Sequence, residues 1–232
     1  MADPLIELSD LRFRWRPSDP PVVDIPALHI AAGERVFIQG PSGSGKTTLL
    51  NLLGGLMVPQ AGRIRVLGQE LTEMSGSRRD AFRADHIGFV FQMFNLVPYL
   101  SVTENVTLPC RFSTHRRARA TQHAPTVEAE AERLLSHMHV GASVLAGRPA
   151  AELSTGQQQR VAAARAFIGR PELIIADEPT SSLDADAHSA FLDLLFAEVA
   201  DCGATIVYVS HDASLAASFD RALAFADFNR RS

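Results

Sequence analysis

One short stretch of the chain has the residue types and the spacing to hold a chain of phosphates. Residues 40–48 read Gly-Pro-Ser-Gly-Ser-Gly-Lys-Thr-Thr, a complete match to the pattern G-x-x-x-x-G-K-[ST]. Glycine carries no Cβ and tolerates positive φ, so the backbone can wrap closely around an anion while its N–H groups point at the charge. Lys46 would reach the β- and γ-phosphates of a nucleotide, and the hydroxyl of Thr47 would bind Mg²⁺.

The flanking residues place this stretch between a strand and a helix. Residues 35–39 are typical of a buried strand, and residues 49–53 are typical of a helix. A glycine-rich turn before a helix is the ordinary alternative, but the complete pattern in this context favours a phosphate site. The residues predicted to bind the phosphates are Gly40, Pro41, Ser42, Gly43, Ser44, Gly45, Lys46, Thr47 and Thr48.

A second candidate is a pair of carboxylates that follows an apolar run. Residues 173–176 read Leu-Ile-Ile-Ala and lead directly into Asp177 and Glu178. The carboxyl ends of strands are where α/β sheets bind ligands. There Asp177 would hold Mg²⁺ through its water shell, and Glu178 would orient and polarise an attacking water. A surface turn is the alternative for this pair taken alone.

A third candidate is a helix start. Residues 153–160 read Leu-Ser-Thr-Gly-Gln-Gln-Gln-Arg and run into an alanine-rich stretch. Ser154 fits an N-cap, and alanine favours the helix that follows. The N–H groups at a helix start form a second possible anion site. A simple capped helix is the alternative.

Strands and helices alternate around these motifs. Three strand-like runs predict an antiparallel sheet: residues 5–16, 22–38 and 62–68. Three apolar runs are typical of buried core strands: residues 87–91, 173–176 and 204–209. Residues 101–170 are mainly helical, with an insertion around residues 113–126. The alternation predicts an α/β fold with a mostly parallel sheet.

Bulk composition excludes several classes of protein. The chain has 232 residues with 46% hydrophobic residues and a net charge of −4, which argues against a general nucleic-acid binder. No apolar run approaches the ~20 residues that span a bilayer. The N-terminal residues lack the layout of a signal peptide. We therefore expect a soluble chain that reaches a membrane only through a partner.

The cysteines, histidines and clustered arginines do not indicate a further functional site. Cys110 and Cys202 lie far apart in the sequence, which suggests neither a disulfide framework nor a zinc site and fits a reducing compartment. The eight histidines are scattered. The basic residues Arg116, Arg117 and Arg119 are expected to lie on a solvated surface turn.

The three motifs, in this order, resemble those of the nucleotide-binding subunits of ABC transporters, and the resemblance covers nearly the whole chain. Gln92 resembles the family's glutamine that senses Mg²⁺ and the water, and His211 resembles the histidine that contacts the γ-phosphate. Trp15 resembles the aromatic residue that stacks on adenine. Residues 181–184, ending at Asp184, resemble the loop that touches the other subunit's site. The resemblance also assigns nucleotide contacts of that other subunit to Ser154, Thr155, Gly156 and Gln157.

Three positions have alternatives. The family signature usually reads Ser-Gly-Gly-Gln, and Thr155 stands in place of the first glycine. Threonine is tolerated there if φ is negative and is costly if φ is positive. Trp15 continues the alternation of Leu11 and Phe13, so a core position is its alternative. His211 could be an ordinary loop histidine.

The resemblance implies a P-loop NTPase core with a mostly parallel sheet, an antiparallel β subdomain and a helical subdomain. We expect one domain over residues 1–232, with the core and β part at about 1–92 and 166–232 and the helical part at about 93–165. The implied cofactors are ATP and Mg²⁺. The implied catalytic residues are Glu178, His211, Gln92 and Lys46, and the implied Mg²⁺ contacts are Thr47, Gln92 and Asp177.

The implied function is ATP hydrolysis in a head-to-tail dimer, with homodimer and heterodimer both open, whose closure drives a separately encoded membrane permease. Residues 40–55, 87–98 and 104–109 resemble the lipoprotein-releasing and macrolide-export ATPases. The group that the permease's coupling helix would contact is Phe94, Leu96, Val97 and Pro98, with core packing as the alternative. The expected location is cytoplasmic, at the inner face of the cell membrane.

Other classes remain as alternatives. One is a non-transport ABC ATPase of chromosome maintenance or repair, although the chain has no sustained heptad segment for its coiled coils. Another is the ATPase of a cell-division complex. A third is a module that binds ATP without turnover, against which Glu178 and His211 argue.

Overall fold

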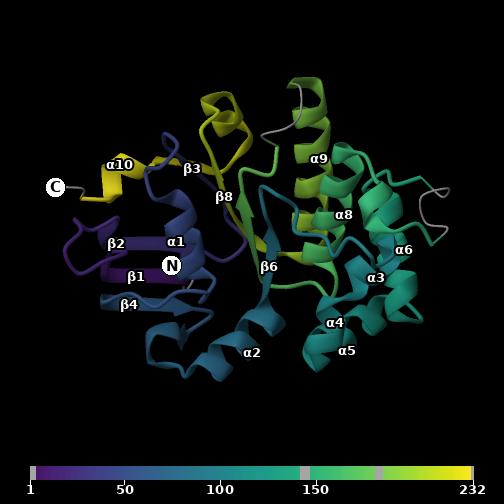
Figure 1. The fold of residues 1–232 in the computed structure, drawn as a ribbon, viewed down its shortest axis with the longest axis horizontal. Coiled ribbons are helices and arrows are strands. Elements are labelled where there is room, and N and C mark those ends of the chain that lie inside the picture. The colour runs from purple at the N-terminus through teal and green to yellow at the C-terminus, as the bar shows by residue number, and fades with distance from the viewer. Residues whose placement is uncertain (1–3, 142–146, 181–184, 231–232) are drawn as a thin grey trace. The chain divides into compact units, whose positions relative to one another are not determined.

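The computed structural model describes residues 4–141, 147–180 and 185–230 (Figure 1). The chain divides into two compact units: the first comprises Met1–Arg83 and Thr205–Ser232, and the second comprises Ala84–Ala204. The expected division into a core and a helical subdomain at residues 93 and 165 stays a prediction.

The first unit contains an antiparallel sheet with the strand order β2-β1-β4-β5 (Figure 1). Its strands are β1 (Pro4–Phe13), β2 (Val23–Ala31), β4 (Ala61–Val66) and β5 (Gln69–Glu70). Leu8 of β1 pairs with Leu28 of β2 on one side and with Ile64 of β4 on the other, and all three side chains are buried. The sheet buries one face through this alternation, as the sequence predicts.

Three parallel strands of the same unit lie side by side in the order β8-β3-β9. They are β3 (Arg35–Gln39), β8 (Thr205–Ser210) and β9 (Arg221–Ala224). Val36, Phe37 and Ile38 are fully buried, the continuous burial that a parallel strand with both faces covered requires. Gln39 pairs with Ser210, so the residues that follow β3 and β8 leave the sheet at the same edge.

The expected single strand over residues 22–38 is wrong. The chain leaves the antiparallel sheet at Ala31, turns, and enters the parallel strand at Arg35. Gly33 occupies the turn with a φ of 75°, and its N–H donates to Oγ1 of Thr205 at 2.8 Å. Residues 31–35 read Ala-Ala-Gly-Glu-Arg, so the apolar alternation is interrupted there, and the glycine with the two charged residues after it is a turn signal that the expectation overlooked.

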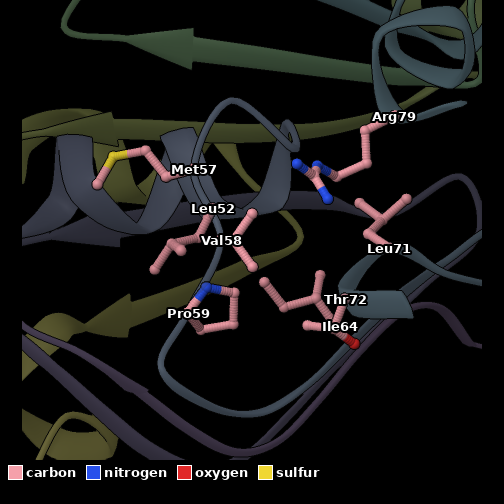
Figure 2. Close-up of a pocket in the computed structure, with 8 residues that line it drawn as sticks. All are labelled: Leu52, Met57, Val58, Pro59, Ile64, Leu71, Thr72 and Arg79. Carbon is pink, nitrogen blue, oxygen red and sulfur yellow. The ribbon is translucent and has the colours of Figure 1, made fainter. Parts of the chain in front are cut away.

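Helical elements cover the rest of the first unit. They are α1 (Lys46–Leu53), the 3₁₀ turns η1 (Leu71–Glu73) and η3 (Ala213–Ser218), and α10 (Phe225–Phe228), while α2 (Gly76–His86) runs past its boundary. Figure 2 shows a small pocket with Arg79 among its lining residues. Nη1 of Arg79 donates to the carbonyl oxygen of Met74 at 2.6 Å. The lining of the pocket is Leu52, Met57, Val58, Pro59, Ile64, Leu71, Thr72 and Arg79. The pocket has no room for a water molecule, so it is core packing.

The second unit is built from one parallel strand pair and several helices. The strands are β6 (Ile87–Val90) and β7 (Leu173–Asp177). The helices are α3 (Val102–Thr107), α4 (Pro109–Phe112), α5 (Thr114–His123), α6 (Val127–His137), η2 (Ala150–Glu152), α8 (Thr155–Phe167) and α9 (Ala185–Cys202). Among the helices of the described ranges, none combines the length and the apolar character needed to cross a bilayer.

Close packing of α8 on β6 depends on a glycine. A Cβ built on Gly88 would lie 2.3 Å from the carbonyl oxygen of Ala166 and 2.8 Å from Cδ1 of Ile174. No side chain fits at that distance, so glycine lets the helix backbone approach the strand directly. This contact fixes the start of the loop that carries Gln92.

The expectation that Arg116, Arg117 and Arg119 form a solvated surface turn is wrong. All three lie on helix α5 within the expected insertion, and Arg116 is only 2% exposed. Burial lowers the pKa of Arg116 to about 10, so the buried side chain is still a cation at neutral pH. Arg119 forms an ion pair with Glu172. A local charge count cannot foresee this, because the burial comes from packing against α8 and the segment after it.

Candidate functional site

The predicted phosphate loop connects β3 to α1 and needs glycine at two positions. Gly43 and Gly45 have φ of 74° and 111°, values that favour glycine. A Cβ built on Gly45 would lie 2.9 Å from Cγ1 of Val22 and 3.0 Å from the Val22 carbonyl oxygen, so a side chain has no room there. Gly45 caps α1 without a side-chain hydrogen bond. The helix start therefore has the form of an anion site.

Lys46 is the only lysine in the chain and is folded into this loop. It is 5% exposed, and its Nζ donates to the carbonyl oxygens of Gly40 at 2.7 Å and Pro41 at 3.0 Å. The buried hydroxyl of Ser44 has no hydrogen-bond partner in the described part of the chain. A buried ammonium beside an unpartnered buried hydroxyl fits a phosphate, whose oxygens would accept from both. Thr47, the next residue of α1, is exposed.

His211 comes to the same edge of the first unit as the phosphate loop. It directly follows Ser210, the last residue of β8, and it is exposed. The N–H of Gly40 donates to the carbonyl oxygen of Ser210 at 3.4 Å. Neighbouring parallel strands thus place the start of the loop and His211 close together, although they are far apart in the sequence.

Trp15 is not a core residue. It lies just after β1 and is 62% exposed. Its ring packs edge-on against Phe13, with 5.3 Å between the ring centroids and an interplanar angle of 87°. The alternation through Leu11 and Phe13 ends before Trp15, so the core alternative is excluded and an exposed aromatic face remains for a ligand.

The two predicted carboxylates lie at the end of β7 in the second unit. Asp177 is its last residue, and Glu178 follows with a φ of 43°. Left-handed backbone is unusual for a residue with a Cβ and clusters at functional sites. Nε2 of the buried Gln159, on α8, donates to the carbonyl oxygen of Pro179 at 2.9 Å. This bond holds the turn directly after the carboxylates.

Gln92 lies exposed in the turn after β6, at the start of a loop that an arginine holds in place. Phe94 and Asn95 have positive φ of 57° and 49°. Nη2 and Nη1 of Arg165, on α8, donate to their carbonyl oxygens at 2.5 and 2.7 Å. Burial lowers the pKa of Arg165 to about 10, so it remains a cation at neutral pH. Phe94 itself is buried, which fits the core-packing alternative for that residue.

An asparagine fixes the far end of the same loop. Asn105, on α3, is fully buried, and its Oδ1 accepts from the N–H of Val97 at 2.8 Å. Its Nδ2 donates to the carbonyl oxygens of Val97, Leu100 and Ser101 at 3.0 to 3.2 Å. The loop after Gln92 is thus clamped by Arg165 at one end and Asn105 at the other.

The predicted signature begins α8 with a capping box. The N–H of Gln157 donates to Oγ of Ser154 at 3.4 Å, and the N–H of Ser154 donates to Oε1 of Gln157 at 3.0 Å. Thr155 does not have positive φ, so threonine is unstrained there, and the space around Gly156 is open. Asp184 lies outside the described residues.

Three positioning residues were missed from the sequence: Gln159, Arg165 and Asn105. Gln159 and Arg165 lie in α8 with three other long polar residues, Gln157, Gln158 and Arg160, so the sequence does not single them out. Asn105 follows a Ser-x-x-Glu cap motif, which does not single it out either. Their partners are backbone carbonyls and N–H groups, which a sequence does not specify.

Known proteins share both sequence and fold with this chain. The ABC transporter family model matches residues 23–181. The lipoprotein-releasing system ATP-binding protein LolD of Chromohalobacter salexigens is 41% identical over 211 residues, which cover 91% of this chain and 85% of that protein. The macrolide export ATP-binding/permease protein MacB of Burkholderia thailandensis is 38% identical, and the match spans 98% of this chain but 34% of that protein. The ATP-binding cassette MJ0796 has been solved as a dimer in a post-hydrolysis state bound to ADP and Pi. It superposes on this chain with a TM-score of 0.80 at 34% sequence identity, and the match covers 94% of this chain and 92% of the MJ0796 chain.

An α/β fold with a glycine-rich loop, a buried lysine and a helix start defines a nucleotide-binding protein of the P-loop class. The family model matches residues 23–181, and a relative is 41% identical over a match that covers 91% of this chain, so the chain belongs to the ABC transporter family. It binds ATP and is an ATPase subunit that drives transport. The predicted fold class and ATPase function are confirmed, while the roles of individual site residues stay predictions.

Proposed function

We propose that the chain is the motor of a transport complex whose permease is a separate polypeptide, of the lipoprotein-release or export type. The support is its 41% identity to the ATP-binding protein of a lipoprotein-releasing system and its 38% identity to a macrolide export protein. The chain would work in the cytoplasm at the inner face of the membrane and contact the membrane only through the permease.

The observation that carries the site assignment is the buried hydroxyl of Ser44, which has no hydrogen-bond partner among the described residues, in the same loop as the buried ammonium of Lys46. Lys46 would pair with β- and γ-phosphate oxygens, and Ser44 would donate to a phosphate oxygen. Thr47, Gln92 and Asp177 would hold Mg²⁺, which neutralises phosphate charge when it is bound. Glu178 would orient the attacking water, His211 would contact the γ-phosphate, and Trp15 would stack on adenine.

A second copy of the chain, or a related chain, would complete each site. Its Ser154–Gln157 helix start would face the γ-phosphate, with an exposed Thr155 and open space at Gly156. Its Asp184 would lie at the same junction. Closure of such a dimer on ATP and opening after hydrolysis is a two-state motion that a permease can use.

Substitution of Lys46 tests the catalytic part of this proposal. Lys46→Ala should abolish most phosphate release, because the ammonium offsets charge on the β- and γ-phosphates. Lys46→Arg should fail as well, because a planar guanidinium does not fit the space of a compact ammonium. The chain already contains many arginines and no other lysine. Full turnover in Lys46→Arg would show that any cation suffices and would contradict the proposed geometry.

Chemical labelling tests the binding part in the unmodified protein. Since Lys46 is the only lysine, an amine-reactive reagent has one side-chain target, and the chain's amino terminus is an internal control. ATP with Mg²⁺ should protect Lys46 from acetylation and leave the amino terminus equally reactive, as measured by peptide mass spectrometry. Equal labelling of Lys46 with and without saturating ATP would refute the assignment.

A further inference from the structure

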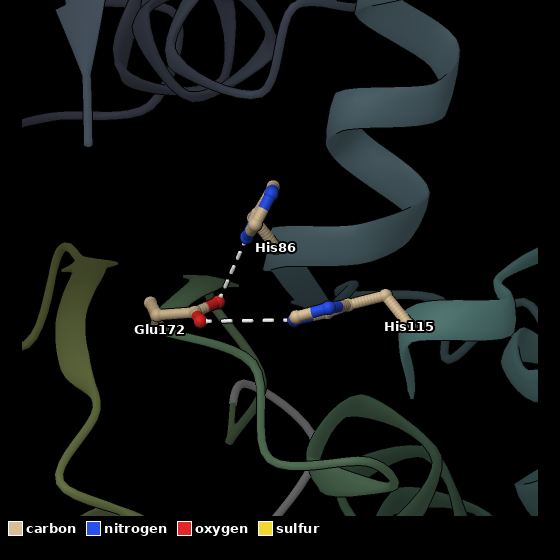
Figure 3. A group of neighbouring side chains, drawn as sticks. All are labelled: His86, His115 and Glu172. Atoms are coloured by element: carbon tan, nitrogen blue, oxygen red, sulfur yellow. Dashed lines mark hydrogen bonds and ion pairs between the residues drawn. The ribbon is translucent and has the colours of Figure 1, made fainter. Parts of the chain in front are cut away.

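Three side chains that the proposed function does not use converge in the second unit (Figure 3). His86 is the last residue of α2, His115 lies in the first turn of α5, and Glu172 directly precedes β7. Nδ1 of His86 lies 3.0 Å from Oε2 of Glu172, and Nε2 of His115 lies 4.0 Å from its Oε1. We propose that these residues form a binding site for a divalent transition-metal ion of the zinc type.

The donor set has the chemistry for such an ion. Two imidazole nitrogens and one carboxylate oxygen, with water as a fourth ligand, are a common zinc set. Ligand atoms at 2.0–2.1 Å from a tetrahedral ion lie about 3.3 Å apart. Here one ligand atom from each residue lies within 4.8 Å of the other two. Small side-chain rotations would therefore bring all three onto one ion.

The backbone that carries these ligands is tightly packed. Oγ of Ser113 accepts from the N–H of Arg116 at 2.9 Å and donates to Oδ1 of Asp85 at 2.5 Å, which ties the start of α5 to the end of α2. A Cβ built on Gly169 would lie 2.6 Å from Cβ of Arg116, so the segment that leads to Glu172 runs directly against α5. Three segments distant in sequence are thus held together independently of any ion, as a pre-organised site requires.

Two arginines oppose the ion. Arg119 forms an ion pair with Oε1 of Glu172. The buried cation of Arg116 is close enough to interact electrostatically with both Arg119 and Glu172. Metal binding must therefore displace Arg119 from one carboxylate oxygen. The alternative is an ordinary ion cluster in which Arg119 and His86 satisfy Glu172 and no metal enters.

Titration of the tag-free, nucleotide-free chain with Zn²⁺ alone separates these two possibilities. Isothermal titration calorimetry should show one saturable site per chain in the wild type. His115→Ala and Glu172→Gln should each weaken it by at least about tenfold. His123→Ala removes an exposed histidine at the other end of the same helix and is the matched control. Arg119→Gln should strengthen binding, because it frees a carboxylate oxygen and removes a positive charge.

Cobalt supplies a second readout. Co²⁺ bound by this donor set should give visible absorption bands in the wild type and in His123→Ala, and the bands should be lost in His115→Ala. Absence of saturable Zn²⁺ binding in the wild type would overturn the proposal. Equal weakening in His115→Ala and His123→Ala, or weaker binding in Arg119→Gln, would also overturn it.

Discussion

Truncation of Asn105 tests how much this side chain contributes to holding the far end of the loop after Gln92. Asn105→Ala removes the acceptor of the Val97 N–H and the Nδ2 donor to three carbonyl oxygens. Those three oxygens keep other partners: Ser101 O accepts from the Asn105 N–H, Leu100 O from the Ala150 N–H, and Val97 O from the Leu100 N–H. The Val97 N–H is therefore the group that loses its acceptor.

The magnitude follows from that count. The unpaired Val97 N–H costs about 1–3 kcal/mol, and Nδ2, which has two hydrogens to share among the three oxygens, loses two net hydrogen bonds of about 0.5–1.5 kcal/mol each, so we expect the free energy of unfolding to fall by about 2–6 kcal/mol. Asn105→Asp keeps the volume and one acceptor but points a carboxylate oxygen at carbonyl oxygens, so it should cost at least as much.

Urea unfolding followed by circular dichroism measures the loss. Thr103→Ala on the same helix is the matched control and should stay within about 0.5 kcal/mol of wild type. Phosphate release should fall as well, because the loop that carries Gln92 loses one of its two clamps. An unfolding free energy of Asn105→Ala within about 0.5 kcal/mol of wild type would refute the reasoning.

Two further predictions concern the phosphate loop and a buried thiol. Gly45→Ala should abolish ATP binding, because its Cβ would lie 2.9 Å from Cγ1 of Val22. Gly33→Ala is the control: Gly33 also has a positive φ, 75° against 111° at Gly45, but no described atom lies within 4 Å of its Cβ position, so this variant should lose only stability. Equilibrium dialysis with labelled ATP checks both variants, and ATP binding by Gly45→Ala would contradict the geometry. Burial raises the pKa of Cys110 from 9.0 to about 11. In a Cys202→Ser background, the rate of labelling by a disulfide reagent should therefore keep rising up to about pH 11, since the thiolate reacts; a plateau near pH 9 in the folded chain would disprove it.

The site motifs were predictable because their chemistry is contiguous in the sequence. The phosphate loop, the N-cap at Ser154 and the apolar run before Asp177 each need only local pattern and propensity. Whether Thr155 is tolerated in the signature, in contrast, depends on a backbone angle that only the structure shows. The error over residues 22–38 was avoidable, because Gly33 and the charged residues Glu34 and Arg35 interrupt the apolar pattern between the two strands.

The features that could not be predicted depend on contacts between segments that are distant in the sequence. The clamp residues Asn105 and Arg165 bond to backbone atoms whose positions depend on the finished fold. Arg116 is buried because Gly169 lets another segment approach α5 within contact distance. His86 and His115 are separated by two helices in the chain and meet only through such contacts. The left-handed φ of Glu178 is likewise imposed by its surroundings.

The central claim is that ATP is held between two copies of the chain and is hydrolysed with the help of Glu178. Glu178→Gln keeps the size of the side chain but removes the negative charge that polarises the water. ATP should then bind without being hydrolysed, and a ligand that binds only the closed state stabilises that state by mass action. If the partner is a different chain, that chain belongs in the assay.

The controls change Ser154, which the second copy of the chain would contribute to the proposed site. Ser154→Arg in the Glu178→Gln background should block the approach of the second copy to the γ-phosphate. Ser154→Ala also removes the N-cap, at a cost of about 1 kcal/mol, but adds no bulk, so it should still dimerise. A difference between these two variants separates steric blockage from loss of the helix cap.

Size-exclusion chromatography with light scattering is the direct measurement. The account predicts that Glu178→Gln runs as a dimer with ATP and as a monomer with ADP, and that Ser154→Arg in the same background is monomeric with both nucleotides. A Glu178→Gln protein that binds ATP tightly yet stays monomeric at high concentration, alone and with its partner, would contradict the shared site.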